Sequence, residues 1–227
     1  MPVVRLRSAV CLLGRFPALA GVDLDADAGE VVLLSGANGA GKTTLLRLVA
    51  GLVPLYSGEA VVFGHDLARD RQGARRQLAL VGHETFCYDD LTVRENLSLA
   101  ARASGGTVAA ADAALERLGL THVRDVDHRR LSAGQRRRLA LAVALARDPR
   151  LLLLDEPHAG LDADGRAVLD AIVRNAPDEG RTVLLASHEL ELARPLADRE
   201  VVLSAGRNLD VAEDAVEDVV DVAVAEV

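Results

Sequence analysis

Residues 31–44 have the sequence VVLLSGANGAGKTT, and this stretch decides the fold. Its first five residues form the kind of apolar run that is typical of a strand buried on both faces of a sheet. Residues 36–43 fit the pattern G-x-x-x-x-G-K-[ST], in which a glycine-rich loop between a strand and a helix binds phosphates. The backbone N–H groups of such a loop converge on the phosphates, and the helix N-terminus adds positive potential. The sequence therefore predicts a site for a nucleoside triphosphate.

Amino-acid usage singles out Lys42 within this loop. Of the 26 basic residues, 25 are Arg and Lys42 is the single Lys. A chain so biased toward Arg is expected to keep Lys where a compact ammonium on a flexible stem is needed. We expect Lys42 to reach the β- and γ-phosphates of ATP, and the Thr43 hydroxyl to ligate Mg²⁺. The residues predicted to contact ATP in this segment are Gly36, Ala37, Asn38, Gly39, Ala40, Gly41, Lys42, Thr43 and Thr44.

A second apolar run, residues 151–154, ends in the carboxylates Asp155 and Glu156. Ligands bind outside the carboxyl ends of strands in open α/β sheets. Asp155 is therefore predicted to hold Mg²⁺ through water, and Glu156 to polarise the attacking water as a general base. Taken alone, the same residues would fit a strand that ends in an acidic turn.

Residues 131–135, LSAGQ, precede a helix rich in Ala and Leu. Ser132 and Gln135 have the spacing of a capping box, in which each side chain satisfies a backbone N–H of the other. The pattern fits either a purely structural cap or a second phosphate-binding helix start. On a separate helical subdomain, this helix start would serve the phosphate loop of a second copy rather than its own. The run Arg136–Arg138 that follows is predicted to form a solvated helix face.

The order of the elements predicts an α/β fold with a mostly parallel sheet. Strands are expected at residues 3–6, 18–24, 31–35, 61–63, 78–81, 151–154, 182–186 and 201–203, and helices at residues 45–50, 93–103, 108–118, 133–147, 164–175 and 189–196. One domain is expected over residues 1–207, with a core formed by residues 1–83 and 148–207. Residues from about 84 to 147 are expected to form an inserted helical subdomain, and residues 208–227 an acidic C-terminal tail.

Composition and charge exclude several classes of protein. The 227 residues contain 26 basic and 34 acidic side chains, and seven of the acids lie in the last 18 residues. The remaining body is close to neutral, so no nucleic-acid partner is expected. Neither a membrane-spanning run nor a signal segment is expected from the sequence. Cys11 and Cys87 are predicted to be free, buried thiols in a reducing compartment.

Together these motifs resemble the nucleotide-binding subunits of ATP-binding cassette (ABC) transporters, over residues 3 to about 207. Residues 131–135 match the signature of that family, with Ala133 where its first signature glycine usually sits. Residues 159–162 resemble the D-loop, which adds Asp162 to the nucleotide site. His188 resembles the switch histidine that contacts the γ-phosphate, and it joins Glu156 and Lys42 as a predicted catalytic residue.

The resemblance implies a P-loop (RecA-like) ATPase core with an N-terminal antiparallel β subdomain and an inserted helical subdomain. It also implies a head-to-tail homodimer, in which Ser132, Gly134 and Gln135 of one copy complete the ATP site of the other. Separate ABC transmembrane subunits would dock against the helical subdomain and the loop 86–90. The chain would then lie peripherally on the cytoplasmic face of the plasma (inner) membrane.

The sequence departs from the family pattern at two places. His83 stands where the family normally has the Q-loop glutamine, and a one-residue shift would place Glu84 there. His83 is thus an alternative Mg²⁺ or water contact, although imidazole is a poorer Mg²⁺ ligand than oxygen. The aromatic residue that usually stacks on adenine falls at Leu13, with Phe16 three residues later.

The first departure also bears on the cargo. Gly82-His83 and the LSAGQ signature resemble the ATP-binding subunit of the haem exporter of cytochrome c maturation. The sequence leaves two alternatives open, a motor for export of drugs, lipids or polysaccharide, and a soluble ABC ATPase that acts in assembly.

Overall fold

The computed structural model describes residues 2–82, 85–105 and 107–209. The predictions that concern His83, Glu84 and the tail from residue 210 onward lie outside these residues. Among the described residues, no helix is both long enough and apolar enough to cross a bilayer.

A six-stranded sheet forms the centre of the molecule, in the order β10-β9-β3-β8-β7-β6. Its strands are β3 (Val31–Ser35), β6 (Leu78–Val81), β7 (Leu151–Asp155), β8 (Thr182–Ala186), β9 (Arg199–Ser204) and β10 (Arg207–Asn208). All neighbouring pairs are parallel except β9 and β10. β3, β7 and β8 are buried at every residue because helices or strands cover both faces. The prediction of a mostly parallel sheet is confirmed.

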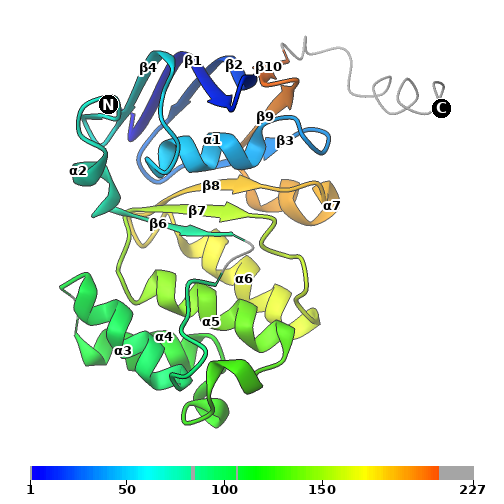
Figure 1. Cartoon of the computed structure of the whole chain (residues 1–227). Coiled ribbons are helices and arrows are strands. Elements are labelled where there is room, and N and C mark those ends of the chain that lie inside the picture. The colour runs from blue at the N-terminus through cyan, green and yellow to red at the C-terminus, as the bar shows by residue number, and fades with distance from the viewer. Residues whose placement is uncertain (1, 83–84, 106, 210–227) are drawn as a thin grey trace.

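The two faces of this sheet belong to two separate hydrophobic cores. Along β3, Val32 and Leu34 point into one core, and Val31 and Leu33 into the other. The first core contains the buried face of α1 (Lys42–Val49), and the second contains the buried faces of α5 (Ala133–Leu145) and α6 (Ala163–Asn175). Figure 1 shows α1 on one side of β7 and β8, with α5 and α6 on the other.

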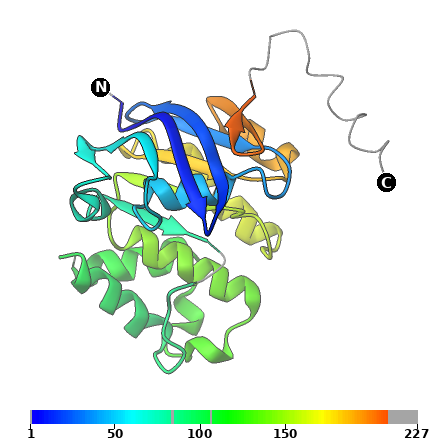
Figure 2. The same ribbon diagram turned by 45° about the horizontal axis from the view of Figure 1, so that its top comes forward.

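A second, four-stranded antiparallel sheet covers the outer side of α1. Its order is β2-β1-β4-β5, with β1 (Val4–Leu13), β2 (Phe16–Ala26), β4 (Ser57–Val62) and β5 (His65–Asp66). Figure 2 shows the β1–β2 hairpin in front of α1. This layer is the N-terminal antiparallel β subdomain expected from the resemblance.

Three helices lie between β6 and β7 in the sequence and pack beneath the sheet. These are α3 (Val93–Ala103), α4 (Val108–Arg117) and α5. α3 begins with a capping box, in which Thr92 and Glu95 satisfy each other's backbone N–H groups. Burial of Leu97, Leu115 and Leu139 joins the three helices into one core with the sheet. The inserted helical layer is confirmed as part of the fold.

Several element bounds differ from the sequence prediction. β1 continues past Leu6 to Leu13 through a bulge at Ser8, which has a φ of 44°, so polar residues interrupt the apolar pattern but not the strand. The short helices α2 (Arg71–Arg75) and α7 (Leu190–Ala193) differ as well. α2 was not predicted, and α7 gives way to a 3₁₀ turn containing Pro195. Cys11 is buried as expected, whereas Cys87 is only half-buried.

Candidate functional site

The phosphate loop connects β3 to α1 at the carboxyl end of the parallel strands. Gly36, Gly39 and Gly41 have φ angles of 129°, 82° and 110°, a region that favours glycine. A Cβ on Gly41 would lie 2.8 Å from the Ala18 carbonyl oxygen, and one on Gly36 would collide with the Leu203 carbonyl. Glycine is therefore required at positions 36 and 41 by the strands packed behind the loop.

The front of the loop is open and rich in donors. Ala37, Asn38 and Gly39 are exposed at its tip. Within the described part of the chain, no side chain caps the N-terminus of α1, which begins directly after Gly41. The first-turn N–H groups of α1 are thus left to bind an anion, which fits the triphosphate of a nucleotide.

Lys42 is buried against the loop that it follows. Its Nζ donates to the carbonyl oxygens of Gly36 at 2.7 Å and Ala37 at 3.2 Å. The ammonium is therefore held inside the curve of the loop, where its positive charge adds to that of the helix N-terminus.

Thr43 and Asp155 meet although 112 residues separate them. The Thr43 hydroxyl donates to Asp155 Oδ1 at 3.1 Å, and Asp155 is buried at the end of β7. These two oxygen ligands suit Mg²⁺, which protein sites usually hold through one or two carboxylates together with phosphate and water. The described residues contain no cluster of three or more His, Cys, Asp or Glu side chains that would hold a metal ion by itself. The donor set therefore fits Mg²⁺ that arrives with a nucleotide.

Glu156 and His188 are also brought together, because each follows one of the adjacent strands β7 and β8. His188 Nδ1 lies 2.8 Å from Glu156 Oε2, and the His188 backbone N–H donates to the same oxygen at 3.2 Å. Glu156 itself has a φ of 48°, a strained conformation for a residue with a side chain. The strained turn directs the carboxylate out of the strand and toward His188.

The signature segment forms the predicted cap at the start of α5. The Ser132 Oγ accepts the Gln135 N–H at 3.2 Å, and Gln135 Oε1 accepts the Ser132 N–H at 2.9 Å. The structure does not bring Ser132, Gly134 and Gln135 to the phosphate loop. α5 and α1 belong to different cores, and among the described residues no hydrogen bond joins the signature to the phosphate loop.

Two further predicted residues have definite places in the structure. Asp162 caps α6 by accepting the Gly165 N–H at 2.8 Å. Leu13 and Phe16 pair across the tip of the β1–β2 hairpin, and Phe16 is 80% exposed. The Ala18 carbonyl of the same hairpin lies directly behind Gly41 of the phosphate loop. The exposed side chains of Leu13 and Phe16 therefore lie near the loop and are open to a ligand.

Sequence reasoning missed two polar contacts at the site. Arg137 was predicted to be solvated, but its guanidinium is half-buried and donates to the backbone carbonyls of Asp155 and Glu156. His128 was not singled out, and its ring lies 2.7 Å from Asp89 Oδ1 and 3.4 Å from the Thr85 hydroxyl. Arg137 could have been found from its spacing, because it precedes the buried residues Ala140 and Leu141 by three and four positions.

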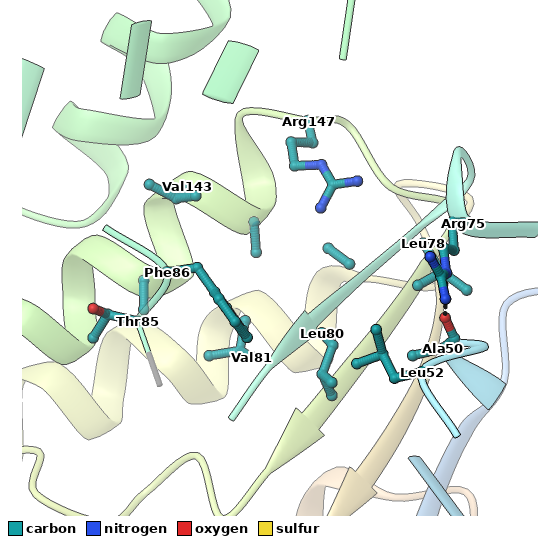
Figure 3. Close-up of a pocket in the computed structure, with 13 residues that line it drawn as sticks. Ala50, Leu52, Arg75, Leu78, Leu80, Val81, Thr85, Phe86, Val143 and Arg147 are labelled. Atoms are coloured by element: carbon teal, nitrogen blue, oxygen red, sulfur yellow. Dashed lines mark hydrogen bonds between the residues drawn. The ribbon is translucent and has the colours of Figure 1, made fainter. Parts of the chain in front are cut away.

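An apolar groove lies between α5 and the exposed edge of β6, with a volume of about 220 Å³. Figure 3 shows Phe86 and Val143 on the α5 side and Leu80 and Leu52 on the strand side. Phe86 is 67% exposed and has a φ of 51°, so a strained loop holds an aromatic side chain toward solvent at the groove. Large exposed apolar side chains around a hollow are typical of a protein-binding surface.

A family model described as ABC transporter matches residues 19–159 of this chain. That range contains the phosphate loop, the signature segment and the carboxylates Asp155 and Glu156 at the end of β7.

Curated proteins with different cargoes are similar to the chain. The daunorubicin resistance ATP-binding protein DrrA3 of Streptomyces coeruleorubidus is 41% identical, over 84% of this chain and 61% of that protein. The sulfate/thiosulfate import ATP-binding protein CysA 2 of Rhizobium meliloti is 40% identical, over 89% of this chain and 58% of that protein. Human phospholipid-transporting ATPase ABCA7 is 36% identical, over 84% of this chain and 9% of that protein. The chain therefore spans about three-fifths of the first two relatives and less than a tenth of the third.

Solved structures with the same architecture include an ATP-binding subunit of an ABC transporter, with a TM-score of 0.84 and 28% identity, covering 91% of this chain and 88% of that one. A dimeric ATP-binding cassette, MJ0796, in a post-hydrolysis state with ADP and Pi, has a TM-score of 0.83 and 26% identity. That match covers 90% of this chain and 96% of the other.

Proposed function

The chain belongs to the ABC transporter family through its ATPase-type cassette, and we propose that it binds and hydrolyses MgATP to power transport through separate membrane subunits. One observation carries this proposal. The pairs Thr43–Asp155 and Glu156–His188 converge at the edge of the sheet beside the phosphate loop, although they come from three distant parts of the sequence. A nucleotide site that only binds would not need the second pair.

The residues divide the chemistry between them. Mg²⁺, held by Thr43 and Asp155, would neutralise charge on the β- and γ-phosphates. Backbone N–H groups of the loop and the Lys42 ammonium bind the triphosphate. Glu156 accepts a proton from the attacking water, and His188 donates to the γ-phosphate. Such catalysis acts mainly by positioning and electrostatic stabilisation.

The site is proposed to be completed by a second copy of the chain. Ser132, Gly134 and Gln135 make no described hydrogen bond to the phosphate loop of their own chain, and α5 and α1 lie in different cores, which supports a role for these residues in a partner's site. A head-to-tail pair would enclose two ATP molecules, each between the loop of one copy and the α5 N-terminus of the other. The exposed Ser132 and the two N–H groups that follow it suit a γ-phosphate.

The groove beside Phe86 is proposed to receive a short helix of a membrane subunit. Its walls are apolar, and Arg75 and Arg147 lie at its rim, which favours a helix with an apolar face and an acidic residue. Hydrogen bonds from α3 hold the segment that follows Phe86. Asn96, which is buried, accepts the Tyr88 N–H at 2.8 Å and donates to the Leu91 carbonyl at 3.2 Å. The proposed location is the cytoplasmic face of the membrane, where such subunits present their helices.

Two cargo classes are proposed, and each has its own support. Haem export in cytochrome c biogenesis rests on the Gly82-His83 pair and the LSAGQ signature. Export of drugs or lipids is the second candidate, and it rests on the 41% identity to a daunorubicin resistance protein and the 36% identity to a phospholipid-transporting ATPase.

Two measurements test the proposal. Purified chain should hydrolyse MgATP, and the absence of turnover together with the absence of nucleotide binding would refute it. A pull-down of the tagged chain in mild detergent should recover polytopic membrane proteins. Accompanying cytochrome c maturation factors would favour haem export, polytopic proteins without them would favour the second cargo class, and soluble partners alone would refute transport in favour of an assembly ATPase.

A further inference from the structure

One arginine of α5 reaches across to the ends of the adjacent strands β6 and β7. Arg137 Nη2 donates to the carbonyl oxygens of Asp155 at 2.9 Å and Glu156 at 2.7 Å. Its Nη1 donates to the carbonyl of Gly82, which directly follows β6. A single planar fork thus joins the signature helix, the end of β7 and the end of β6.

The Arg137 guanidinium makes these contacts in a partly buried position, where water is largely excluded. The Arg137 side chain is half-buried, and its Nε is buried with no partner among the described residues. Burial lowers the pKa of Arg137 below its ordinary value, while the nearby Asp155 and Glu156 carboxylates oppose that shift. Guanidinium suits this role because it stays charged and presents its donors in a fixed geometry.

The carbonyl of Glu156 has a particular need for a partner. The left-handed φ of 48° is a strained conformation for a residue with a side chain, so surrounding hydrogen bonds must hold it. The Glu156 N–H donates to the Ala186 carbonyl at 2.9 Å, and the Glu156 carbonyl accepts from Arg137. The peptide units on either side of the general base are therefore fixed from opposite sides.

We propose that Arg137 is a positioning residue for ATP hydrolysis, which sets the orientation of the Glu156 carboxylate according to the position of the signature helix. This inference rests on the proposed ATPase function. Ser132 lies five residues before Arg137 on the same helix, about 7–8 Å along its axis. A movement of α5 that brings Ser132 against a partner's nucleotide would therefore move the donors that hold the general base.

The test compares two arginines that tie the helical layer to the rest of the chain. Arg117 lies on α4, and Glu179 lies on the loop that follows α6. Both terminal nitrogens of Arg117 donate hydrogen bonds to the Glu179 carboxylate, at 3.1 and 2.8 Å. Arg137→Gln and Arg117→Gln each remove one positive charge and the hydrogen bonds of one guanidinium. Only Arg137→Gln removes contacts to the backbone of Asp155 and Glu156. The kcat and KM for MgATP and the melting temperature are measured for both variants of the full chain.

Arg137→Gln is expected to lower kcat by about tenfold to a hundredfold with KM changed by less than about threefold, since small displacements of a catalytic group have effects of this size. Arg117→Gln is expected to keep kcat within about twofold of the unchanged chain. Arg137→Lys restores the charge and fills the space but lacks the fork, so it should recover the melting temperature while kcat recovers only in part.

Three results would overturn the inference: a kcat for Arg137→Gln within about twofold of the unchanged chain, an equal fall in Arg117→Gln, or full recovery of kcat in Arg137→Lys. If Arg137→Gln does not fold, the comparison of Arg137→Lys with Arg117→Gln decides on the same criteria. Failure of the unchanged chain to hydrolyse MgATP would count against the proposed function instead.

Discussion

Replacement of Glu156 by Gln is expected to stop hydrolysis without loss of nucleotide binding. The substitution keeps the size of the side chain and an oxygen that can accept the His188 N–H, now at 3.2 Å from Glu156 Oε2. It removes the negative charge and with it the capacity to take a proton from water. The phosphate loop, Lys42 and the Thr43–Asp155 pair are left unchanged.

The size of the effect follows from the two roles of the carboxylate. A positioned general base contributes about 10²–10⁴-fold to a rate, so kcat should fall by that factor, or about 3–5 kcal/mol in activation free energy. The contact with His188 contributes little to stability, because the His188 side chain is 56% exposed and exposed polar pairs are worth less than about 1 kcal/mol. For a domain of this size, that corresponds to a fall in melting temperature of no more than about 4 °C.

The assay measures the rate of ATP hydrolysis and the molar mass of the protein in solution. Phosphate release is measured for the unchanged chain, for Glu156→Gln and for Glu191→Gln, which makes the same charge change on the exposed surface of α7. Light scattering after gel filtration in MgATP should give Glu156→Gln a mass about twice the 24.0 kDa of one chain. The reason is that ATP that is not hydrolysed should keep the proposed head-to-tail dimer closed. Turnover of Glu156→Gln equal to that of Glu191→Gln would refute the assignment of the general base.

Three further outcomes are expected. Gly41→Ala should lower the melting temperature more than Gly39→Ala, because both need a positive φ but only the new Cβ at 41 would approach a carbonyl, at 2.8 Å, as thermal denaturation will measure. Lys42→Ala should abolish binding of a fluorescent ATP analogue, while Arg47→Ala, on the exposed side of the same helix, should bind it normally. Burial raises the pKa of Cys87 to about 11, so its thiolate is rare below that pH. Alkylation of Cys87 at pH 8 should be more than about a hundredfold slower than in the unfolded chain and should rise with pH, as mass spectrometry of the labelled peptide will measure.

The sequence could predict the parts of the site that depend on strand order. The loop 36–43 and the carboxylates after residue 154 each follow an apolar run, and parallel strands deliver their carboxyl ends to one edge. The same logic brings His188 to Glu156, since β7 and β8 are adjacent. The capping box at Ser132 was predictable because it is formed within four consecutive residues.

The contacts of Arg137 and His128 were not predicted, because they depend on how the helical layer sits against the strands. A long side chain can leave a helix surface in several directions, and sequence spacing gives only the face that it shares. Helical spacing does place Arg137 with the buried Ala140 and Leu141, but it does not identify the carbonyls of Asp155 and Glu156 as its partners. These three carbonyl acceptors, at the ends of β6 and β7, come together only in the folded chain.

The groove lies close to the hydrogen bonds of Arg137, which connects it to the backbone of Glu156. Val143 and Ala144 of α5 line the groove, and Arg137 lies seven residues before Ala144, about 10 Å along the same helix. A helix that enters the groove would contact α5 on one side and β6 on the other. Gly82, whose carbonyl Arg137 also holds, directly follows β6. Both walls of the groove are therefore connected through one guanidinium to the backbone of Glu156, so a partner in the groove and a nucleotide at the signature would act on the general base through the same residue.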